Sequence, residues 1–191
     1  MRKPKRHDVF GPLMHIMGLR GIGIEIGVAE GKFSEIILNT SPLRKLYLLD
    51  IWKEFSMDEY TDGNNAAQAE QDRRYQLVLN KMQQYGERVS VLREDSRKSF
   101  KQFHDGFFDF IYIDANHSYE GVKIDIENWY PKCKSGGIFA GHDYVDTVGG
   151  RKKFPCGVKQ AVHELRDEIG AALLITGGTY RCPSSWYFIK P

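Results

Sequence analysis

The stretch Ile24-Glu25-Ile26-Gly27-Val28-Ala29-Glu30-Gly31-Lys32-Phe33-Ser34 carries the clearest structural signal in this chain of 191 residues. A short apolar run leads into an acid and two spaced glycines. A helical pattern follows, in which Phe33, Ile36 and Ile37 recur at i, i+3 and i+4. Glycine suits a tight turn because it tolerates positive φ and lets a ligand approach the backbone. The stretch therefore predicts a strand at 23–26, a glycine turn and then a helix.

The acid and the glycines of this turn, Glu25, Gly27 and Gly31, follow the spacing E-x-G-x-x-x-G. This pattern differs from the G-x-G-x-x-G turn that cradles a pyrophosphate, so we rank a nicotinamide-dependent dehydrogenase last. An acid at the start of the turn repels phosphate and attracts an ammonium group. The turn therefore indicates a nucleoside ligand that carries a positive charge and no phosphate.

Strand and helix patterns alternate through most of the chain. We predict strands at 23–26, 45–49, 89–92, 108–113, 137–140, 172–176 and 185–189, and helices at 32–38, 66–85, 97–103, 119–130 and 158–169. Near-continuous apolar strands suit a parallel sheet covered on both faces, and the last two strands are close enough to pair as an antiparallel edge. We therefore predict a doubly wound, seven-stranded α/β fold in a single domain, 1–191, with 1–20 as an N-terminal extension.

Composition and charge exclude several classes of function. The net charge of +2 is too small to indicate nucleic acid, and we expect the basic cluster from Arg2 to Arg6 to be solvated surface. No apolar run approaches the roughly 18 residues of a membrane span. The three cysteines lack C-x-x-C spacing, which favours a reducing compartment over disulfides or a zinc site. We therefore expect a cytoplasmic protein that binds neither nucleic acid nor membrane, and we leave a homo-oligomer open.

Acidic residues also follow the second and third predicted strands, at the edge where ligands of open α/β sheets bind. Asp50 comes 25 residues after Glu25, and a carboxylate there can accept both hydroxyls of a ribose. Glu94, Asp95 and Ser96 follow the third strand, where an acid can accept the exocyclic amine of adenine. Each acid alone is more often a cap or a turn residue, but their order after successive strands favours a nucleoside site.

Two acids and two histidines follow the next two predicted strands. Asp114 and His117 come after the fourth strand, and His142 and Asp143 come after the fifth. Together they offer enough lone pairs for a divalent ion; carboxylates favour Mg²⁺, Ca²⁺ or Mn²⁺, and imidazoles favour Mn²⁺, iron or zinc. In the alternative interpretation, Asp114 caps a helix and His142 is a hydrogen-bonded turn residue. We rank the functional interpretation first because the two histidines are flanked by aspartates.

Two segments at the same edge of the predicted sheet are candidate substrate loops. Residues 52–65 are acidic, aromatic and rich in turn formers, and residues 144–156 combine two glycines with a basic run. Long loops at this edge of an α/β sheet often contact substrate. An ordinary surface loop explains 52–65 about as well.

In this order, the motifs resemble those of class I S-adenosylmethionine-dependent methyltransferases. The resemblance covers about residues 20 to 190 and rests on Glu25–Gly31, Leu49–Trp52, Phe108–Val122 and Gly136–Tyr144. The nearest subgroup contains small-molecule and sugar O-methyltransferases of natural-product pathways and their cephalosporin hydroxylase relatives. The resemblance implies a Rossmann-like methyltransferase fold with S-adenosylmethionine as the cofactor.

The resemblance also implies a contact with the cofactor for seven residues. Glu25, Gly27 and Gly31 would hold the methionine part, and Asp50 would hold the ribose. Trp52 would pack against the face of the nucleoside, and Asp95 and Ser96 would contact the adenine.

Further positions correspond to catalytic groups of metal-dependent O-methyltransferases. In those enzymes an acid after the fourth strand and a consecutive pair after the fifth hold the ion, and these positions are Asp114, His142 and Asp143 here. That pair is usually acid–acid or acid–amide, so His142 departs from the pattern. Related catechol-type enzymes carry a basic residue three positions after the first metal acid, which is His117 in this chain.

The expected reaction is methyl transfer from S-adenosylmethionine to a hydroxyl of a small molecule, a sugar or a natural product. A divalent ion, Mg²⁺ or Mn²⁺ in preference to Fe²⁺ or Zn²⁺, would lower the pKa of the hydroxyl, and His117 would accept its proton. Two alternatives stay open: a metal-dependent hydroxylase-like enzyme on the same fold, and a non-catalytic S-adenosylmethionine-binding protein.

Overall fold

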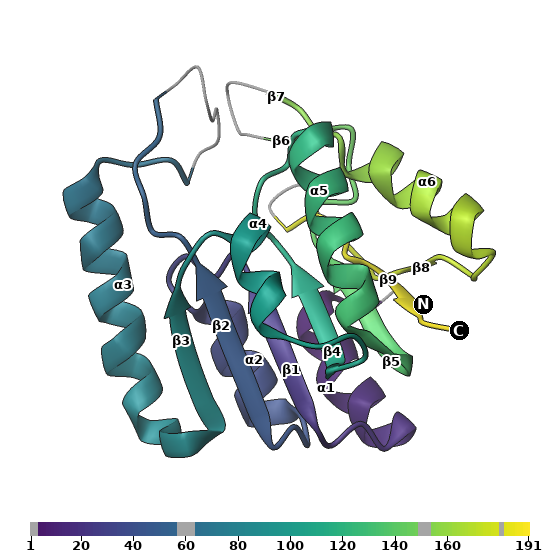
Figure 1. Cartoon of the computed structure of the whole chain (residues 1–191), viewed down its shortest axis with the longest axis horizontal. Helices are drawn as coiled ribbons and strands as arrows, with labels where there is room; N and C mark the ends of the chain where they lie inside the picture. The colour runs from purple at the N-terminus through teal and green to yellow at the C-terminus, as the bar shows by residue number, and fades with distance from the viewer. Residues whose placement is uncertain (1–3, 57–63, 149–153, 180–181) are drawn as a thin grey trace.

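The computed structural model describes residues 4–56, 64–148, 154–179 and 182–191. Its sheet contains β1 (Ile22–Ile26), β2 (Lys45–Asp50), β3 (Val89–Arg93), β4 (Phe108–Ile113), β5 (Cys133–Gly141), β8 (Leu174–Ile175) and β9 (Trp186–Ile189). The strand order is β3-β2-β1-β4-β5-β9-β8 (Figure 1). The first five strands are parallel, and β9 runs antiparallel to both of its neighbours, β5 and β8. The predicted seven-stranded, mostly parallel sheet with an antiparallel C-terminal edge is confirmed.

The helices connect these strands. They are α1 (Arg6–Met17), α2 (Lys32–Thr40), α3 (Gln68–Met82), α4 (Ser96–Ser99), α5 (Tyr119–Trp129) and α6 (Val158–Ile169), with 3₁₀ turns η1 (Gln83–Arg88), η2 (Phe100–Gln102) and η3 (Tyr130–Lys132). None of the helices described combines the length and the apolar character needed to cross a lipid bilayer.

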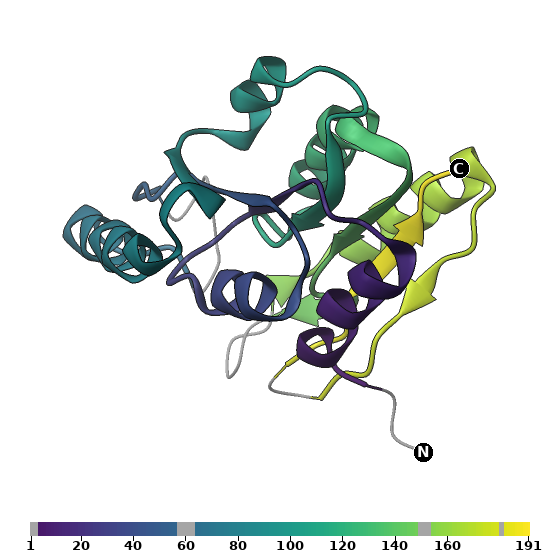
Figure 2. The same cartoon turned by 90° about the horizontal axis from the view of Figure 1, so that it is seen from below.

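Helices cover both faces of the sheet, as expected of a doubly wound fold. α1, α2 and α3 contribute to the core on one face, and α5 and α6 to the core on the other; Figure 2 shows α1 and α2 on the opposite side from α5. All six residues of β4 are buried. Phe110 and Tyr112 join the first core, whereas Ile111 and Ile113 join the second. From Phe110 to Ile113 the strand therefore presents large side chains to both layers.

The N-terminal residues form a helix that the sequence patterns did not predict. The extension expected at 1–20 contains α1, whose Phe10 and Met14 are fully buried. Gly11 allows α1 to lie close against α2, since a Cβ at this position would be 2.3 Å from Thr40 Oγ1. Gly11 and Pro12 both have low helix propensity, and tertiary packing outweighs it here.

A short hairpin interrupts the connection between β5 and α6. β6 (Thr147–Val148) pairs antiparallel with β7 (Phe154–Pro155). Part of the predicted substrate loop at 144–156 therefore has β structure. Residues 149–153 of that loop and residues 57–63 of the other lie outside the part of the chain that the structure describes.

Candidate active site

A cavity of about 490 Å³ opens at the carboxyl ends of the parallel strands. Its walls come from the glycine turn after β1, the segment after β2, the start of α4 and the segment between β4 and α5. Cofactor sites typically have volumes in this range. Several residues predicted for the site line this cavity: Gly27, Asp50, Asp95, Ser96 and Asp114.

Gly27 brings the turn after β1 against the end of β4. Its φ is +87°, and a Cβ here would lie 2.0 Å from the carbonyl oxygen of Asp114. The Gly27 N–H donates to the Leu49 carbonyl oxygen at 2.8 Å. Gly31 also has a positive φ, +72°, but it is the N-cap residue of α2 and is not part of the cavity wall. Of the two glycines, Gly27 is therefore the one at which a ligand can lie on the backbone.

The Asp50 carboxylate organises the glycine turn. Its Oδ2 accepts the N–H groups of Val28 and Ala29 at 2.8 and 2.9 Å, and its Oδ1 accepts the Trp52 N–H at 2.9 Å. The Trp52 indole is buried in the core and donates to the Ala29 carbonyl oxygen at 2.9 Å. Trp52 is not in the cavity wall, so its predicted packing against the nucleoside stays a prediction. Asp50 does reach the cavity, and its remaining lone pairs can accept a ribose hydroxyl.

Glu25 is buried in the core, where its carboxyl accepts a hydrogen bond from the Ser34 hydroxyl of α2. Burial raises the pKa of Glu25 to about 8. A neutral carboxyl does not attract an ammonium group by charge, and Glu25 is not in the cavity wall. Its predicted contact with the methionine part of the cofactor therefore stays a prediction.

Glu25→Gln should stabilise the fold more at high pH than at low pH. The folded protein holds this proton up to about pH 8, whereas the unfolded chain releases it near the ordinary value of 4.5. The stability that Glu25 contributes is thus fully present below pH 4.5 and is lost as the pH rises towards 8. Glutamine keeps the bond from Ser34 and does not ionise. Urea unfolding should show the variant gaining on the order of 3 kcal/mol over the wild type between pH 5 and pH 8; an equal difference at both pH values would contradict the assignment.

The predicted adenine residues lie at the start of α4. Asp95 caps this helix: its Oδ1 accepts the Arg97 N–H at 3.0 Å, and its carboxylate also pairs with the Arg97 guanidinium. These bonds hold the pKa of Asp95 below its ordinary value. The Ser96 hydroxyl donates to Asp125 Oδ1 at 2.7 Å. Asp125 belongs to α5, is 3% exposed and also lines the cavity.

Sequence reasoning missed Asp125, although the sequence contains a signal for it. The buried stripe of α5 includes Val122, Ile126 and Trp129. Asp125 comes three residues after Val122 and four before Trp129, so the helical period places an acid on the apolar stripe. An acid at such a position needs a partner or a function, because burying it alone is unfavourable.

The two aspartates and two histidines predicted at the ends of β4 and β5 form one cluster. His117 Nε2 lies 2.7 Å from Asp143 Oδ2 and 3.5 Å from Asp114 Oδ1. His142 Nδ1 lies 3.2 Å from Asp143 Oδ1 and 3.7 Å from Asp114 Oδ1. The other ring nitrogen of His142, Nε2, lies 3.1 Å from the Pro183 carbonyl oxygen. Both histidines therefore point at the same pair of carboxylates.

The cluster has an unusual backbone conformation at Asp143, and its charges favour ionised carboxylates. Asp143 has a φ of +52°, a conformation that is uncommon for a residue other than glycine and is often found at functional sites. Burial opposes its charge, but hydrogen bonds from His117 and His142 outweigh burial and hold the pKa of Asp143 well below its ordinary value. Burial also opposes the charge of Asp114, and the same histidines, together with Arg6, nevertheless lower its pKa.

Arg6 was predicted to be solvated surface, and this prediction is wrong. The first turn of α1 places Arg6 over the cluster, where its Nη1 donates to Asp114 Oδ2 at 2.9 Å and to the Tyr112 hydroxyl at 3.1 Å. The guanidinium also lies 4.8 Å from the centre of the Phe33 ring. A basic run indicates solvated surface only where the adjoining segment does not pack against the sheet. Here α1 packs against the sheet, since its Phe10 is in the core, and this packing buries most of the Arg6 side chain as well.

Comparison with known proteins now identifies the family. Residues 24–144 match the family model described as a methyltransferase domain. The chain belongs to this family. The motifs had indicated a class I S-adenosylmethionine-dependent methyltransferase, and the family match together with the sheet order confirms it.

Solved structures share the fold of this methyltransferase domain. One is a Staphylococcus aureus protein assigned as a caffeoyl-CoA O-methyltransferase, with a TM-score of 0.64, 17% identity and coverage of 97% of this chain and 82% of that one. Another is a SAM-dependent methyltransferase from Aquifex aeolicus, with a TM-score of 0.57, 15% identity and coverage of 93% and 87%. At these identities, the likeness shows the fold alone.

A curated relative is much longer than this methyltransferase domain. The uncharacterized protein y4gI of Sinorhizobium fredii is 27% identical over an alignment of 143 positions that covers 72% of this chain and 15% of that protein. The chain thus spans about 15% of the length of that relative.

One predicted substrate loop borders the cavity of the methyltransferase domain. Among its described residues, Lys53, Phe55, Asn64 and Asn65 line the wall. Asn65 accepts the Phe55 N–H at 3.0 Å and donates to the Phe55 carbonyl oxygen at 2.9 Å, which closes the base of the loop. The described part of 52–65 therefore frames the cavity from the side of β2.

Proposed function

We propose that this methyltransferase domain transfers the methyl group of S-adenosylmethionine to a hydroxyl of a small molecule, such as a sugar or a natural product. The observation that carries the proposal is the cluster of Asp114, His117, His142 and Asp143 beside the cavity. It supplies a proton acceptor and negative charge next to the expected cofactor. The acceptor molecule itself is assigned from the resemblance and the chemistry of this cluster.

The reaction needs little covalent chemistry from the protein. The S–CH₃ bond of the sulfonium breaks as the O–CH₃ bond forms, which leaves S-adenosylhomocysteine. The hydroxyl proton passes to His117 at Nδ1, because Nε2 already donates its own proton to the Asp143 carboxylate 2.7 Å away. That carboxylate stabilises the resulting imidazolium. Orientation of the acceptor against the methyl group supplies much of the remaining rate.

The cluster also fits a divalent cation. Ligand atoms of Asp114, His117 and Asp143 all lie within 4.8 Å of one another. Two carboxylates and an imidazole suit Mn²⁺ or Mg²⁺. A cavity of about 10 Å³, close to the size of one water or ion, adjoins Asp114, His117 and His142. We propose Asp114, Asp143 and, through Nδ1, His142 as the ligands of the ion, with His117 beside them as the base. The ion would lower the pKa of a bound hydroxyl.

The proposal is tested by activity and metal binding together. The purified protein is incubated with radiolabelled S-adenosylmethionine and a panel of sugars and catechols, before and after removal of metal with EDTA, and calorimetry measures Mn²⁺ binding. We expect methylation that EDTA abolishes and Mn²⁺ restores. Methylation that EDTA does not change would remove the metal and leave His117 as the base. Tight cofactor binding without turnover on any hydroxylated compound would instead favour a non-catalytic binding protein.

Asp50→Ala should weaken the binding of S-adenosylhomocysteine. Three backbone N–H groups lose their acceptor, and a ribose acceptor is lost as well. We expect a cost of about 2–4 kcal/mol in binding. Calorimetry measures this cost, and urea unfolding shows how much of it accompanies a loss of fold stability. Asp50→Asn keeps one acceptor oxygen and should lose less; unchanged affinity in Asp50→Ala would remove Asp50 from the site.

A second candidate function follows from the presence of both histidines in the cluster. Two imidazoles and a carboxylate with open positions are the ligand set of non-haem Fe²⁺ oxygenases. An enzyme of this kind would purify with iron and would consume dioxygen during turnover. Iron content and an oxygen electrode therefore separate hydroxylation from methyl transfer.

A further inference from the structure

Asp125 is a buried acid that the proposed methyl transfer does not use. It lies on α5, it is 3% exposed, and it forms part of the cavity wall. Among the described residues, its one hydrogen-bond partner is the Ser96 hydroxyl, which donates to Oδ1 at 2.7 Å. The second carboxyl oxygen therefore remains available to a ligand. A buried acid with one carboxyl oxygen that accepts no hydrogen bond from the described residues indicates a binding role.

The neighbouring acid is less able to take a ligand. Asp95 already accepts the Arg97 N–H at 3.0 Å, Nε at 2.9 Å and Nη2 at 2.8 Å. These bonds use most of the lone pairs that its two oxygens offer. Asp125 has no cation within hydrogen-bond distance among the described residues, so the edge of a bound base can compete for its free oxygen.

The wall beside Asp125 suits a flat, partly apolar ring. The preceding residue, Ile124, is 39% exposed and also lines the cavity. An exposed isoleucine at a cavity wall is covered when a ring lies against it. Ile124 therefore offers an apolar surface in the wall of the same cavity as Asp125 and Ser96.

We propose that Asp125 selects adenine over a 6-oxopurine by accepting the exocyclic amine, with Ser96 holding the carboxylate in position. The proposal rests on the S-adenosylmethionine site proposed above and assigns the adenine-reading acid to α5 rather than to Asp95. An adenine presents N–H donors to a carboxylate, whereas a 6-oxopurine presents a carbonyl oxygen that the carboxylate repels. Burial raises the pKa of Asp125 to about 6, so at pH 8 the group is ionised and acts only as an acceptor.

The test compares two ligands that differ at this one edge of the base. Calorimetry at pH 8 measures the binding of S-adenosylhomocysteine and S-inosylhomocysteine to the wild type and to Asp125→Asn. We expect the wild type to prefer the adenine ligand by at least about tenfold. Asp125→Asn should reduce or invert that preference, because an amide can donate to the 6-oxo group.

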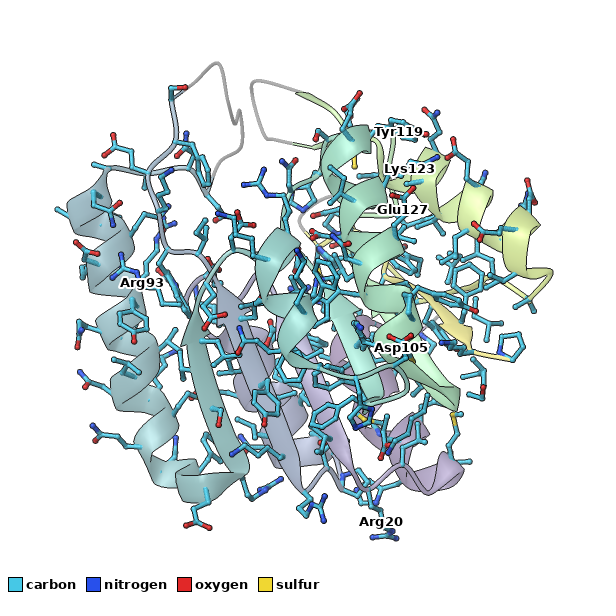
Figure 3. The ribbon with its side chains drawn as sticks, in the orientation of Figure 1. Arg20, Arg93, Asp105, Tyr119, Lys123 and Glu127 are labelled. Atoms are coloured by element: carbon cyan, nitrogen blue, oxygen red, sulfur yellow. The ribbon has the colours of Figure 1, made fainter. Side chains whose placement is uncertain are left out.

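Glu127→Gln is the matched control, since it also converts an acid to an amide on α5. Glu127 is exposed, and Figure 3 labels it along α5 with Tyr119 and Lys123. This variant should keep the wild-type preference. If Asp125→Asn does not fold, Ser96→Ala takes its place and should narrow the preference several-fold, because the carboxylate loses its fixed orientation.

The contrary results distinguish a failure of the Asp125 inference from a failure of the proposed cofactor site. Equal binding of the two ligands by the wild type overturns the role of Asp125 and leaves the cofactor site in place. An unchanged preference in Asp125→Asn, or in Ser96→Ala if that variant is used, has the same consequence. Binding of neither ligand by the folded wild type overturns both this inference and the proposed cofactor site.

Discussion

Asp143→Asn should lower turnover by about 10²- to 10⁴-fold while leaving the affinity for S-adenosylhomocysteine nearly unchanged. The Asp143 carboxylate faces both histidines of the cluster, at 2.7 and 3.2 Å, whereas the predicted nucleoside contacts lie on other strands. Asparagine is the informative replacement, because it tolerates the positive φ of this position better than alanine does. Initial rates and calorimetry on the same protein sample measure the two effects.

Asp146→Asn provides the control for this experiment. Asp146 lies three residues further along, its side chain is 82% exposed, and it pairs with Lys159 on the surface. It should retain wild-type turnover, so a loss in Asp143→Asn alone locates the effect in the cluster. If Asp143→Asn kept full turnover and Mn²⁺ binding, the cluster would have no part in the reaction.

Gly27→Ala should be the most destabilising of the single substitutions considered, with a loss of about 3–5 kcal/mol in the free energy of unfolding. The added methyl group would overlap the Asp114 carbonyl oxygen, 2.0 Å away, and the residue would have to keep a φ of +87°. Neither neighbour can move far, because the Gly27 N–H is bonded to Leu49 and the Asp114 N–H to Ile26. Urea unfolding measures the loss.

Gly106→Ala separates the cost of the steric overlap from the cost of the positive φ. Gly106 has a φ of +64°, but no atom lies within 4 Å of the position that an added methyl group would occupy. This variant should therefore lose only about 1–2 kcal/mol, the cost of the backbone conformation. Similar losses at both glycines would mean that the close approach to β4 relaxes easily, and Gly27 would then be needed only for its φ.

The fold could be predicted because its signals are local. The apolar run of β4 and the stripe of α6 are readable from neighbouring residues, and their bounds, Phe108–Ile113 and Val158–Ile169, match the prediction. Gly27, Asp50 and Asp114 could be placed at the cavity for a related reason. Parallel strands bring their carboxyl ends to one edge, so the order of polar residues after each strand predicts which of them meet.

The remaining features depend on side-chain direction and on long-range packing. Glu25 points to the face of the sheet that α2 covers, where it accepts a hydrogen bond from Ser34, and the Trp52 indole donates to Ala29. A strand-end position alone does not say which way these side chains point. Arg6 could not be predicted from its neighbours, because its partner Asp114 is 108 residues away. Asp125 could have been predicted from the helical period.

The placement of Arg6 has a consequence for the order in which the parts of the site form during folding. The Val28–Asp50 bond that shapes the glycine turn spans 22 residues, whereas His142 meets Pro183 across 41, Tyr112 meets Ser185 across 73 and Arg6 meets Asp114 across 108. Contacts between residues far apart in sequence form slowly during folding, because closing a long loop costs entropy before any contact forms. The bond that shapes the glycine turn can therefore form early, whereas the acid–histidine cluster is complete only after both ends of the chain have docked. Folding kinetics followed by a probe at the glycine turn should therefore run ahead of the recovery of activity.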